Sequence, residues 1–304
     1  TLRHNQIHHT GLYKLGPATG VGVLLGCASA TCRVTNSMIE QNYVHDLRST
    51  SSGGNDGIVV KVGSGGNMLR HNVIHTTTIG TAYPCILVYG GGANPNTVEG
   101  NVVWQCGEAL VALADAVVRN NIVLQSNTGL ASYSHEQVAV LQNVTFVNNT
   151  VYGHAECASL RWAGAVNVVL ANNALYCGVN VGMYGTGLTG AGVTVRANYV
   201  EGTLVGGSLD GTRFLAGGTA AGSFLNPAAL DFWPQAGSLL RNTAEPAYLP
   251  AVDFNGLPRT PSRDVGAYAT KGFAQNIGWR ITPGFKVLSA DGTAPNRPRG
   301  LRVR

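Results

Sequence analysis

The sequence has few charged residues and no long hydrophobic run. Asp, Glu, Lys and Arg make up only 12% of the 304 residues, and 41 residues are glycine. This composition disfavours long helices and fits a chain with many tight turns. No stretch of about eighteen consecutive apolar residues occurs, so we expect no membrane-spanning helix. The net charge is only +5, and Lys and Arg do not cluster with interleaved aromatic residues, which argues against nucleic acid as a partner.

Signals for secretion and for zinc are also missing. No signal peptide stands at the start, where Thr1-Leu2-Arg3-His4-Asn5 already belongs to a repeat, so we expect the chain to be a piece of a longer protein. No Cys-x-x-Cys or Cys/His spacing indicates a zinc site, and we assign no metal ligands. The six cysteines allow fifteen connectivities. Their spacings favour three disulfides and an oxidising, extracellular or cell-surface location, with the pairs Cys27 and Cys32, Cys85 and Cys106, and Cys157 and Cys177.

A short unit recurs along the first two-thirds of the chain, and its plainest copy is Val117-Val118-Arg119-Asn120-Asn121-Ile122-Val123-Leu124. Alignment of the copies gives a column of eight asparagines, at spacings of 37, 30, 29, 20, 28, 24 and 25 residues: Asn5, Asn42, Asn72, Asn101, Asn121, Asn149, Asn173 and Asn198. A repeat of variable length and constant chemistry is typical of a solenoid.

The columns around these asparagines predict strands. The residues three before and two after each asparagine are all apolar, for example Leu69 and Ile74, or Val118 and Val123. Each copy therefore supplies two short strands with inward apolar side chains and a bend between them. We predict an all-β right-handed parallel β-helix in which the asparagines form a buried ladder, about 4.8 Å apart. Such buried amides are tolerated because they bond to one another.

The two positions before each asparagine also show a pattern. The immediately preceding residue is of a kind that tolerates left-handed backbone, and we place the bend there: His4, Gln41, His71, Gly100, Asn120, Asn148, Asn172 and Ala197. One position earlier the charge alternates from copy to copy, in Arg3, Glu40, Arg70, Glu99 and Arg119. We interpret this stripe as register control on a solvated face.

The pattern ends near residue 203, and motifs of another kind follow. Val252-Asp253-Phe254-Asn255-Gly256-Leu257-Pro258-Arg259 and Arg263-Asp264-Val265-Gly266-Ala267-Tyr268 resemble the closing segment of secreted bacterial right-handed parallel β-helix proteins of the pectate-lyase-like superfamily. Ala269 stands where those proteins usually have an acid. We expect coils over 1–203, where the repeat runs, a closing segment that caps the last coil over 204–269, as the resemblance implies, and a tail or linker over 270–304. We expect Asp253 and Asp264 to bind turn amides.

Outward positions on the second strand of each copy form a stripe of histidines and aromatic residues. The stripe lies three residues after the ladder, at His8, His45, His75, Trp104, Leu124, Tyr152, Tyr176 and Glu201. Val73, Val102 and Ile122 make the same wall apolar, so we expect a loop or a partner chain to cover it. The wall could instead be a platform on which sugar rings stack, or adjacent histidines could share a metal.

A third strand in each copy carries the second group of candidates. Its outward side chains include Lys61, Tyr89 and Arg161, with Asp56 and Glu108 in nearby turns. In the superfamily that it resembles, this sheet often lines the substrate groove, and long loops at 9–20, 46–56 and 76–85 place a cleft near residues 45–110. Lys61, followed by Gly63-Ser64 and Asn67, resembles the lysine strand of alginate and chondroitin lyases. Carboxylate signatures of polygalacturonases are absent.

Two functions stay open at this point. The first is an extracellular structural or adhesive protein that assembles into filaments through its open end or its apolar wall, with another copy of itself as partner. The alternative is a protein that binds or cleaves a uronate-containing polysaccharide by β-elimination. For that function we assign Lys61, Tyr89 and His75 to catalysis, and His45, Asp56, Trp104, Glu108 and Arg161 to substrate binding. Calcium is the cofactor that such a lyase would use to neutralise the uronate carboxylate.

Overall fold

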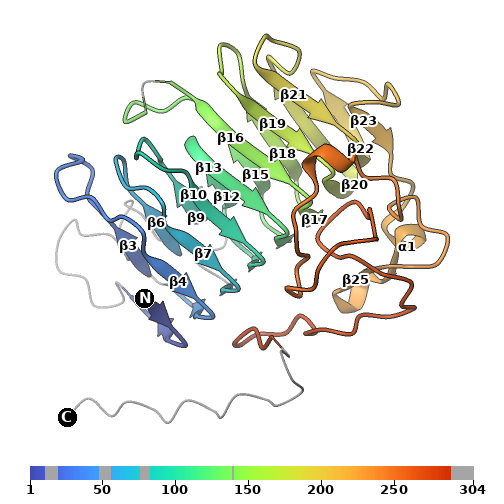
Figure 1. The fold of residues 1–304 in the computed structure, drawn as a ribbon, viewed down its shortest axis with the longest axis horizontal. Coiled ribbons are helices and arrows are strands. Elements are labelled where there is room, and N and C mark those ends of the chain that lie inside the picture. Colours follow the sequence, from blue (N-terminus) through green and yellow to red (C-terminus); the bar gives the residue numbers. More distant parts are fainter. Residues whose placement is uncertain (11–19, 48–55, 76–82, 139, 289–304) are drawn as a thin grey trace.

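The computed structural model in Figure 1 describes residues 1–10, 20–47, 56–75, 83–138 and 140–288. Its regular structure is almost entirely β. Helical turns in this part of the chain are limited to α1 (Ala220–Ser223), η1 (Pro227–Ala229) and η2 (Pro246–Tyr248). None of its helices is long and apolar enough to cross a membrane. The prediction of an all-β fold is confirmed.

The strands stack as successive coils, and every strand pair within the coils is parallel (Figure 1). The ladder strands, which lead into the asparagines, form one sheet: β1 (Leu2–Arg3), β4 (Met38–Glu40), β7 (Met68–Arg70), β10 (Asn96–Glu99), β13 (Ala114–Arg119), β16 (Gln142–Val147), β19 (Val168–Ala171) and β21 (Val193–Arg196). The wall strands follow the asparagines: β2 (Gln6–His8), β5 (Tyr43–His45), β8 (Val73–His75), β11 (Val102–Trp104), β14 (Ile122–Leu124), β17 (Thr150–Tyr152), β20 (Ala174–Thr186) and β22 (Asn198–Val205).

The third strands complete the coils: β3 (Val23–Leu25), β6 (Ile58–Val60), β9 (Pro84–Val88), β12 (Glu108–Ala112), β15 (Thr128–Ser132) and β18 (Glu156–Arg161). The long strand β20 pairs with both β17 and β18 and so joins the wall to the third strands. We did not predict β15, because Thr128-Gly129-Leu130-Ala131-Ser132 has one large apolar residue and a glycine. Strand pairing also continues past residue 203, since β23 (Phe214–Ala216) pairs with β22.

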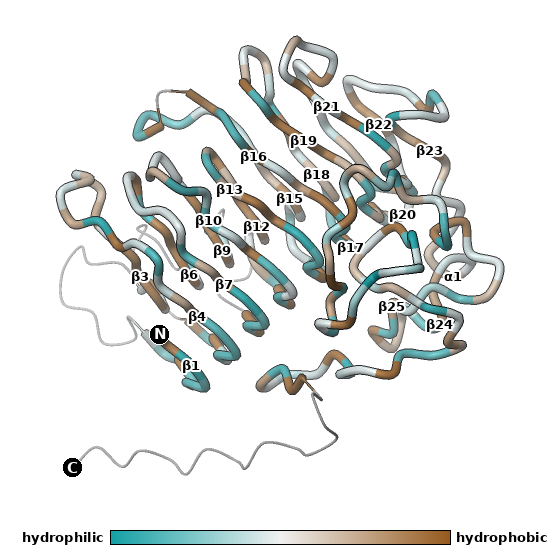
Figure 2. The backbone as a smooth tube through the Cα atoms, viewed as in Figure 1, coloured by the Kyte–Doolittle hydropathy of each residue, from teal (hydrophilic) through white to brown (hydrophobic). Residues whose placement is uncertain are grey.

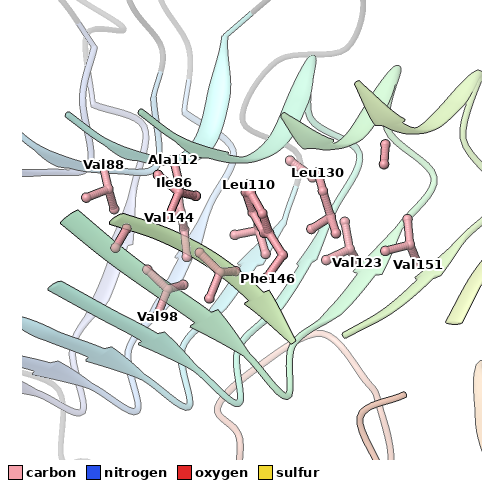
Figure 3. Packing of buried hydrophobic residues seen from close by; sticks show 14 of the residues in the cluster. Ile86, Val88, Val98, Leu110, Ala112, Val123, Leu130, Val144, Phe146 and Val151 are labelled. Carbon is pink, nitrogen blue, oxygen red and sulfur yellow. The ribbon is translucent and has the colours of Figure 1, made fainter. Parts of the chain in front are cut away.

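The core lies inside the coils and is built from identical positions of neighbouring copies. Figure 3 shows Val98, Phe146, Val123, Val151, Ile86 and Leu110 projecting into this interior. Register aligns Val98 with Val118 and Val118 with Phe146, so each buried side chain lies over its counterpart in the next coil. Burial of such a side chain contributes about 1.5–3 kcal/mol, and the stacking explains why the apolar columns never vary.

The asparagine ladder is present as predicted. From Asn5 to Asn173, each Nδ2 donates to Oδ1 of the asparagine in the following coil at 2.9–3.0 Å. The eight residues that precede the ladder all have positive φ, between 51° and 64°, so the predicted bend is confirmed. A second, shorter row was missed: Asn67 Nδ2 donates to Asn96 Oδ1 at 2.9 Å, and Ser37 N donates to Asn67 Oδ1. Its signal is a polar residue five positions before the ladder.

The alternating charges form ion pairs between coils. Glu40 lies 3.5 Å from Arg3 and 2.8 Å from Arg70, and Glu99 lies 3.0 Å from Arg119. Both glutamates are only 7% exposed, so the stripe is less solvated than expected. The pairs still lock neighbouring copies in register, since a shift by one residue would separate the charges.

The three disulfides join the predicted partners. Cys27 pairs with Cys32 across a turn. The pairs Cys85–Cys106 and Cys157–Cys177 each connect successive coils, and all four of these cysteines belong to the buried core. These two bridges therefore clamp the stack from within.

The C-terminal segment, residues 217–288, lies along the outer wall. Its residues Phe224, Phe232, Trp233, Phe254 and Tyr268 form one buried cluster with outward wall side chains such as Val102, Ile122 and Tyr176. It includes the antiparallel pair β24 (Phe224–Asn226) and β25 (Asp231–Pro234). In Figures 1 and 2 its last part runs back toward the first coils, where Phe285 meets Tyr43. We expected a cap that covers the last coil and a tail or linker from residue 270; residues up to 288 pack against the side of the coils.

Side chains of residues 253–268 explain how this segment is fixed. Asp253 accepts bonds from the backbone N–H groups of Asn255, Leu257 and Ala269. Asp264 accepts from the N–H groups of Thr270 and Asn242 at 2.6 and 2.9 Å. Both carboxylates therefore satisfy turn amides, as predicted. The buried Arg259 and Lys286 donate to the bend residues of the coils, at Asn120 Oδ1 and Gly100 O.

Candidate functional site

The outward face of the third strands, which we call the third-strand face, brings most of the predicted site residues together in two rows. Pairing places Pro84, Glu108, Thr128 and Glu156 side by side, and Asp56 continues this row because Gly57 N bonds to Pro84 O. A second row lies two residues beyond the middle of each strand. In the same register it contains Lys61, Tyr89, Leu113, Tyr133 and Arg161.

An apolar strip separates the two rows. Val59, Leu87, Val111 and Ala131 occupy the middle positions, and all four are buried in one small cluster. The face therefore carries acidic groups on one edge and cationic and tyrosine groups on the other, and the apolar strip between them is buried. Such a mixture offers both aromatic surface and hydrogen-bonding groups to a ligand.

Asp56, Lys61 and Tyr89 form the tightest part of this face. Lys61 Nζ lies 4.6 Å from the centroid of the Tyr89 ring, within the range of a cation–π contact. Burial raises the pKa of Asp56 to about 6; Lys61 opposes the rise and Glu108 adds to it. Burial also raises the pKa of Tyr89, and the charges of Asp56 and Glu136 add to that rise. The pKa of Asp56 therefore depends on Lys61, and the pKa of Tyr89 depends on Asp56.

The neighbouring part of the face is held by a hydrogen bond. The hydroxyl of Tyr133 donates to the Glu108 carboxylate at 3.0 Å. Burial raises the pKa of Glu108, whereas this bond and the charge of Arg161 lower it. Burial and the Glu108 carboxylate raise the pKa of Tyr133. Tyr133 was not identified from the sequence because strand β15, which precedes it, was not predicted. An alignment of Ala131-Ser132-Tyr133 with Leu87-Val88-Tyr89 would have identified it.

Lys61→Met is expected to raise the pKa of Asp56 above 6, because the variant loses the positive charge that opposes burial. A folded-state pKa above the unfolded value means that the native state binds the proton more tightly. In the wild type, the stability that protonated Asp56 contributes to the folded state is therefore lost as the pH rises from about 4 to 6. Carbon-detected NMR titration of the carboxyl groups measures the shift, with Arg161→Met as the control four strands away. An unchanged or lower pKa in Lys61→Met would contradict the assignment.

Histidine and tryptophan candidates lie elsewhere, on the wall strands. The ring centroids of His75 and Trp104 lie 4.4 Å apart in an edge-to-face arrangement. Burial lowers the pKa of His75. Trp104 is buried and packs against the C-terminal segment, so it offers no face to a sugar. His45 stacks on His8 and bonds to Asp46 at 2.8 Å. The prediction of one joint site requires His75, His45 and Trp104 to lie on the third-strand face. The structure places them on the wall strands instead.

The apolar wall is covered, as expected, and the covering element is the chain's own C-terminal segment. Within the described residues, no three histidine, cysteine or acidic side chains are arranged as metal ligands. Calcium, which the resemblance to lyases implies, therefore stays a prediction from the sequence. The predicted cleft near residues 45–110 involves loops at 11–19, 48–55 and 76–82, which lie outside the described residues.

Distances on the third-strand face limit its chemistry. Lys61 directly follows strand β6, and Arg161 ends strand β18. Strands β9, β12 and β15 lie between them. Four strand spacings amount to about 19 Å, which is too far for both cations to act on one sugar bond. The face is thus suited to contacts with several units of an extended ligand.

Comparison with known proteins agrees with this architecture. The model of the family described as "Right handed beta helix region" matches residues 1–175. No curated protein matches the chain. The match covers more than half of the sequence and includes every coil up to the first part of β20. The chain therefore belongs to the right-handed β-helix family.

Proposed function

We propose that the protein is an extracellular adhesive β-helix protein that binds a polysaccharide along its third-strand face without cleaving it. The observation that carries the proposal is the pair of rows on either side of a buried apolar strip, which are polar on most strands and interrupted only by Pro84 and Leu113. A ligand that repeats along its length can meet such a surface at several strands. The disulfides support an oxidising location.

Tyrosine and charged groups on this face suit sugar chemistry. The half-buried ring of Tyr133 supplies amphipathic surface, and the carboxylates of Glu108 and Glu156 can accept bonds from sugar hydroxyls. Lys61 and Arg161 are donors that would bind hydroxyls or a uronate carboxylate. Several weak contacts of this kind along one polymer add up to useful affinity.

Binding is favoured over β-elimination because the catalytic requirements are not assembled. Elimination needs a cation at the uronate carboxylate and a base at the same sugar unit. Lys61 is engaged with the Tyr89 ring, Arg161 lies several strands away, and His75 belongs to the wall. A lyase acting on uronate polymers stays the alternative within this proposal.

The binding proposal is tested by affinity electrophoresis through gels that contain neutral or uronate polysaccharides. At least one polymer should retard the wild-type protein, and the double variant Lys61→Ala/Tyr133→Ala should bind about tenfold more weakly, because two contacts of the face are removed. Arg196→Ala, an exposed change on ladder strand β21, is the matched control. Failure of every polymer to retard the protein would refute binding, and accumulation of unsaturated product would replace binding by lyase activity.

Self-assembly is the second candidate, and one observation favours it. In the described residues, β1, β2 and β3 each pair with only one neighbour, namely β4, β5 and β6. Such an edge can accept another strand, from chain that precedes Thr1 or from a second copy. At the opposite end of the described coils, β21 and β23 likewise pair with only one neighbour each, namely β19 and β22. Sedimentation that shows only monomer at high concentration, for wild type as for the edge variant Leu24→Lys, would exclude assembly.

A further inference from the structure

A cleft of about 550 Å³ lies on the other side of the coils from the third-strand face. Its floor comes from the ends of wall strands, with Tyr152 of β17, Tyr176 and Cys177 of β20, and Glu201 of β22. Its rim comes from two stretches of the C-terminal segment, residues 219–221 and 225–228. The coils and the segment that covers them therefore build this cleft jointly.

We propose that this cleft is a separate binding site for a neutral pyranose, such as one unit of an oligosaccharide. Its volume lies within the range of about 300–1,000 Å³ that small-molecule sites occupy. The proposal goes beyond the polysaccharide contact on the third-strand face and uses none of its residues.

An aromatic ring and small apolar side chains line the cleft. Tyr152 is half-buried, and its ring packs against Phe232 with centroids 5.0 Å apart. This contact fixes the ring while one part of it faces the cleft. Ala220, Leu225 and Pro227 add further apolar surface. A rigid aromatic ring beside small apolar groups suits the C–H face of a pyranose.

Polar groups of both kinds surround this apolar floor. The Glu201 carboxylate accepts a bond from Ala220 N at 3.1 Å, which orients it and leaves further lone pairs for ligand hydroxyls. Asn226 Oδ1 accepts from Ala229 N, and its Nδ2 has no acceptor among the described residues, so it can donate to a ligand. Thr219 Oγ1 accepts from Gly222 N, which leaves its hydroxyl hydrogen free to donate.

Charge selects against acidic sugars. Glu201 carries the negative charge of the cleft, and within the part of the chain that the structure describes no lysine, arginine or histidine lines it. A uronate or a sulfated sugar would bring a second negative charge to a partly desolvated carboxylate, which is unfavourable. A neutral sugar can use the same carboxylate as a hydrogen-bond acceptor. This preference separates the cleft from the third-strand face, where Lys61 and Arg161 can bind acidic groups.

The test is ligand-observed NMR and calorimetry on the full chain with cellobiose, maltose, lactose and digalacturonate as probes. We expect at least one neutral disaccharide to bind and digalacturonate to bind at least about tenfold more weakly. Tyr152→Ala should weaken neutral binding about tenfold, and Tyr152→Phe should retain it. Leu225→Arg provides a variant that fills the cleft from an exposed position, 40% accessible, without disturbing the core.

The outcomes separate this site from the polysaccharide face. Leu225→Arg should abolish disaccharide binding and leave polymer retardation unchanged. Lys61→Ala/Tyr133→Ala should weaken polymer binding and leave disaccharide binding unchanged. The cleft proposal is overturned if no neutral disaccharide binds, if Leu225→Arg binds as wild type does, or if digalacturonate binds as tightly as the neutral sugars. None of these results depends on whether a polymer binds the third-strand face.

Discussion

Asn121→Ala is expected to lower the free energy of unfolding by about 3–5 kcal/mol, because it removes four side-chain hydrogen bonds from a fully buried ladder position. Asn121 Oδ1 accepts from Asn101 N and Asn101 Nδ2, and Asn121 Nδ2 donates to Val98 O and Asn149 Oδ1, all at 2.9–3.0 Å. The alanine leaves Asn101 N–H without an acceptor in a region that water does not reach. Chemical denaturation measures the loss.

A matched control separates the ladder from asparagine content in general. Asn180 is exposed, and its Nδ2 donates one bond to His154 O, so Asn180→Ala should cost less than about 1 kcal/mol. Hydrogen exchange should also show faster exchange of the Asn101 amide in Asn121→Ala. Equal stability of the two variants would mean that the buried amides contribute little and that apolar stacking alone holds the coils.

Arg259→Met is expected to release the C-terminal segment from the wall. The Arg259 guanidinium, 2% exposed, donates to the carbonyls of Asp264, Gly266, Ala267 and Tyr268 and to Asn120 Oδ1, at 2.7–3.2 Å. Burial lowers its pKa to about 10, so it is still charged at neutral pH. Removal of a buried cation whose Nη1 and Nη2 groups make five hydrogen bonds costs about 3–5 kcal/mol. The loss should expose the apolar wall behind the segment.

Limited proteolysis and tryptophan fluorescence report this release. Cleavage in the segment should accelerate, and emission should shift to longer wavelength, because Trp233 and Trp104 belong to the cluster between segment and wall. Arg263→Met is the control, because Arg263 is an exposed residue of the same motif whose hydrogen bonds to Asn242 and Ala244 use only its backbone. Protease resistance equal to that of wild type would show that apolar packing holds the segment without Arg259.

Sequence reasoning found the features that each copy states locally. Asn72, its preceding bend residue His71 and the inward Leu69 and Ile74 sit at fixed offsets, so the ladder, the bend and the core columns were predictable. Features that depend on contacts between different copies were harder to predict. The contact of Lys61 with Tyr89 follows from the register of β6 and β9, and β15 was missed because small residues suffice at its position.

The arrangement of the C-terminal segment could not be deduced from its motif. Asp253 and Arg259 indicate a fixed turn but not the surface on which it rests. Trp104 is an example: alternation correctly predicts that its side chain points outward, but that outward side chain is buried in the cluster that the wall and the C-terminal segment form together. The cleft at Tyr152 and Glu201 has the same origin, since residues 219–228 form its other side.

The return path of the C-terminal segment decides how the molecule bears mechanical load. Lys286 Nζ bonds to Gly100 O, and Phe285 meets Tyr43, so the chain at residue 288 is fastened near the early coils. Tension applied there would reach Gly100 and Tyr43 before it reached β21 or β22. The coils at the far end of the stack would therefore carry load only after these contacts had broken.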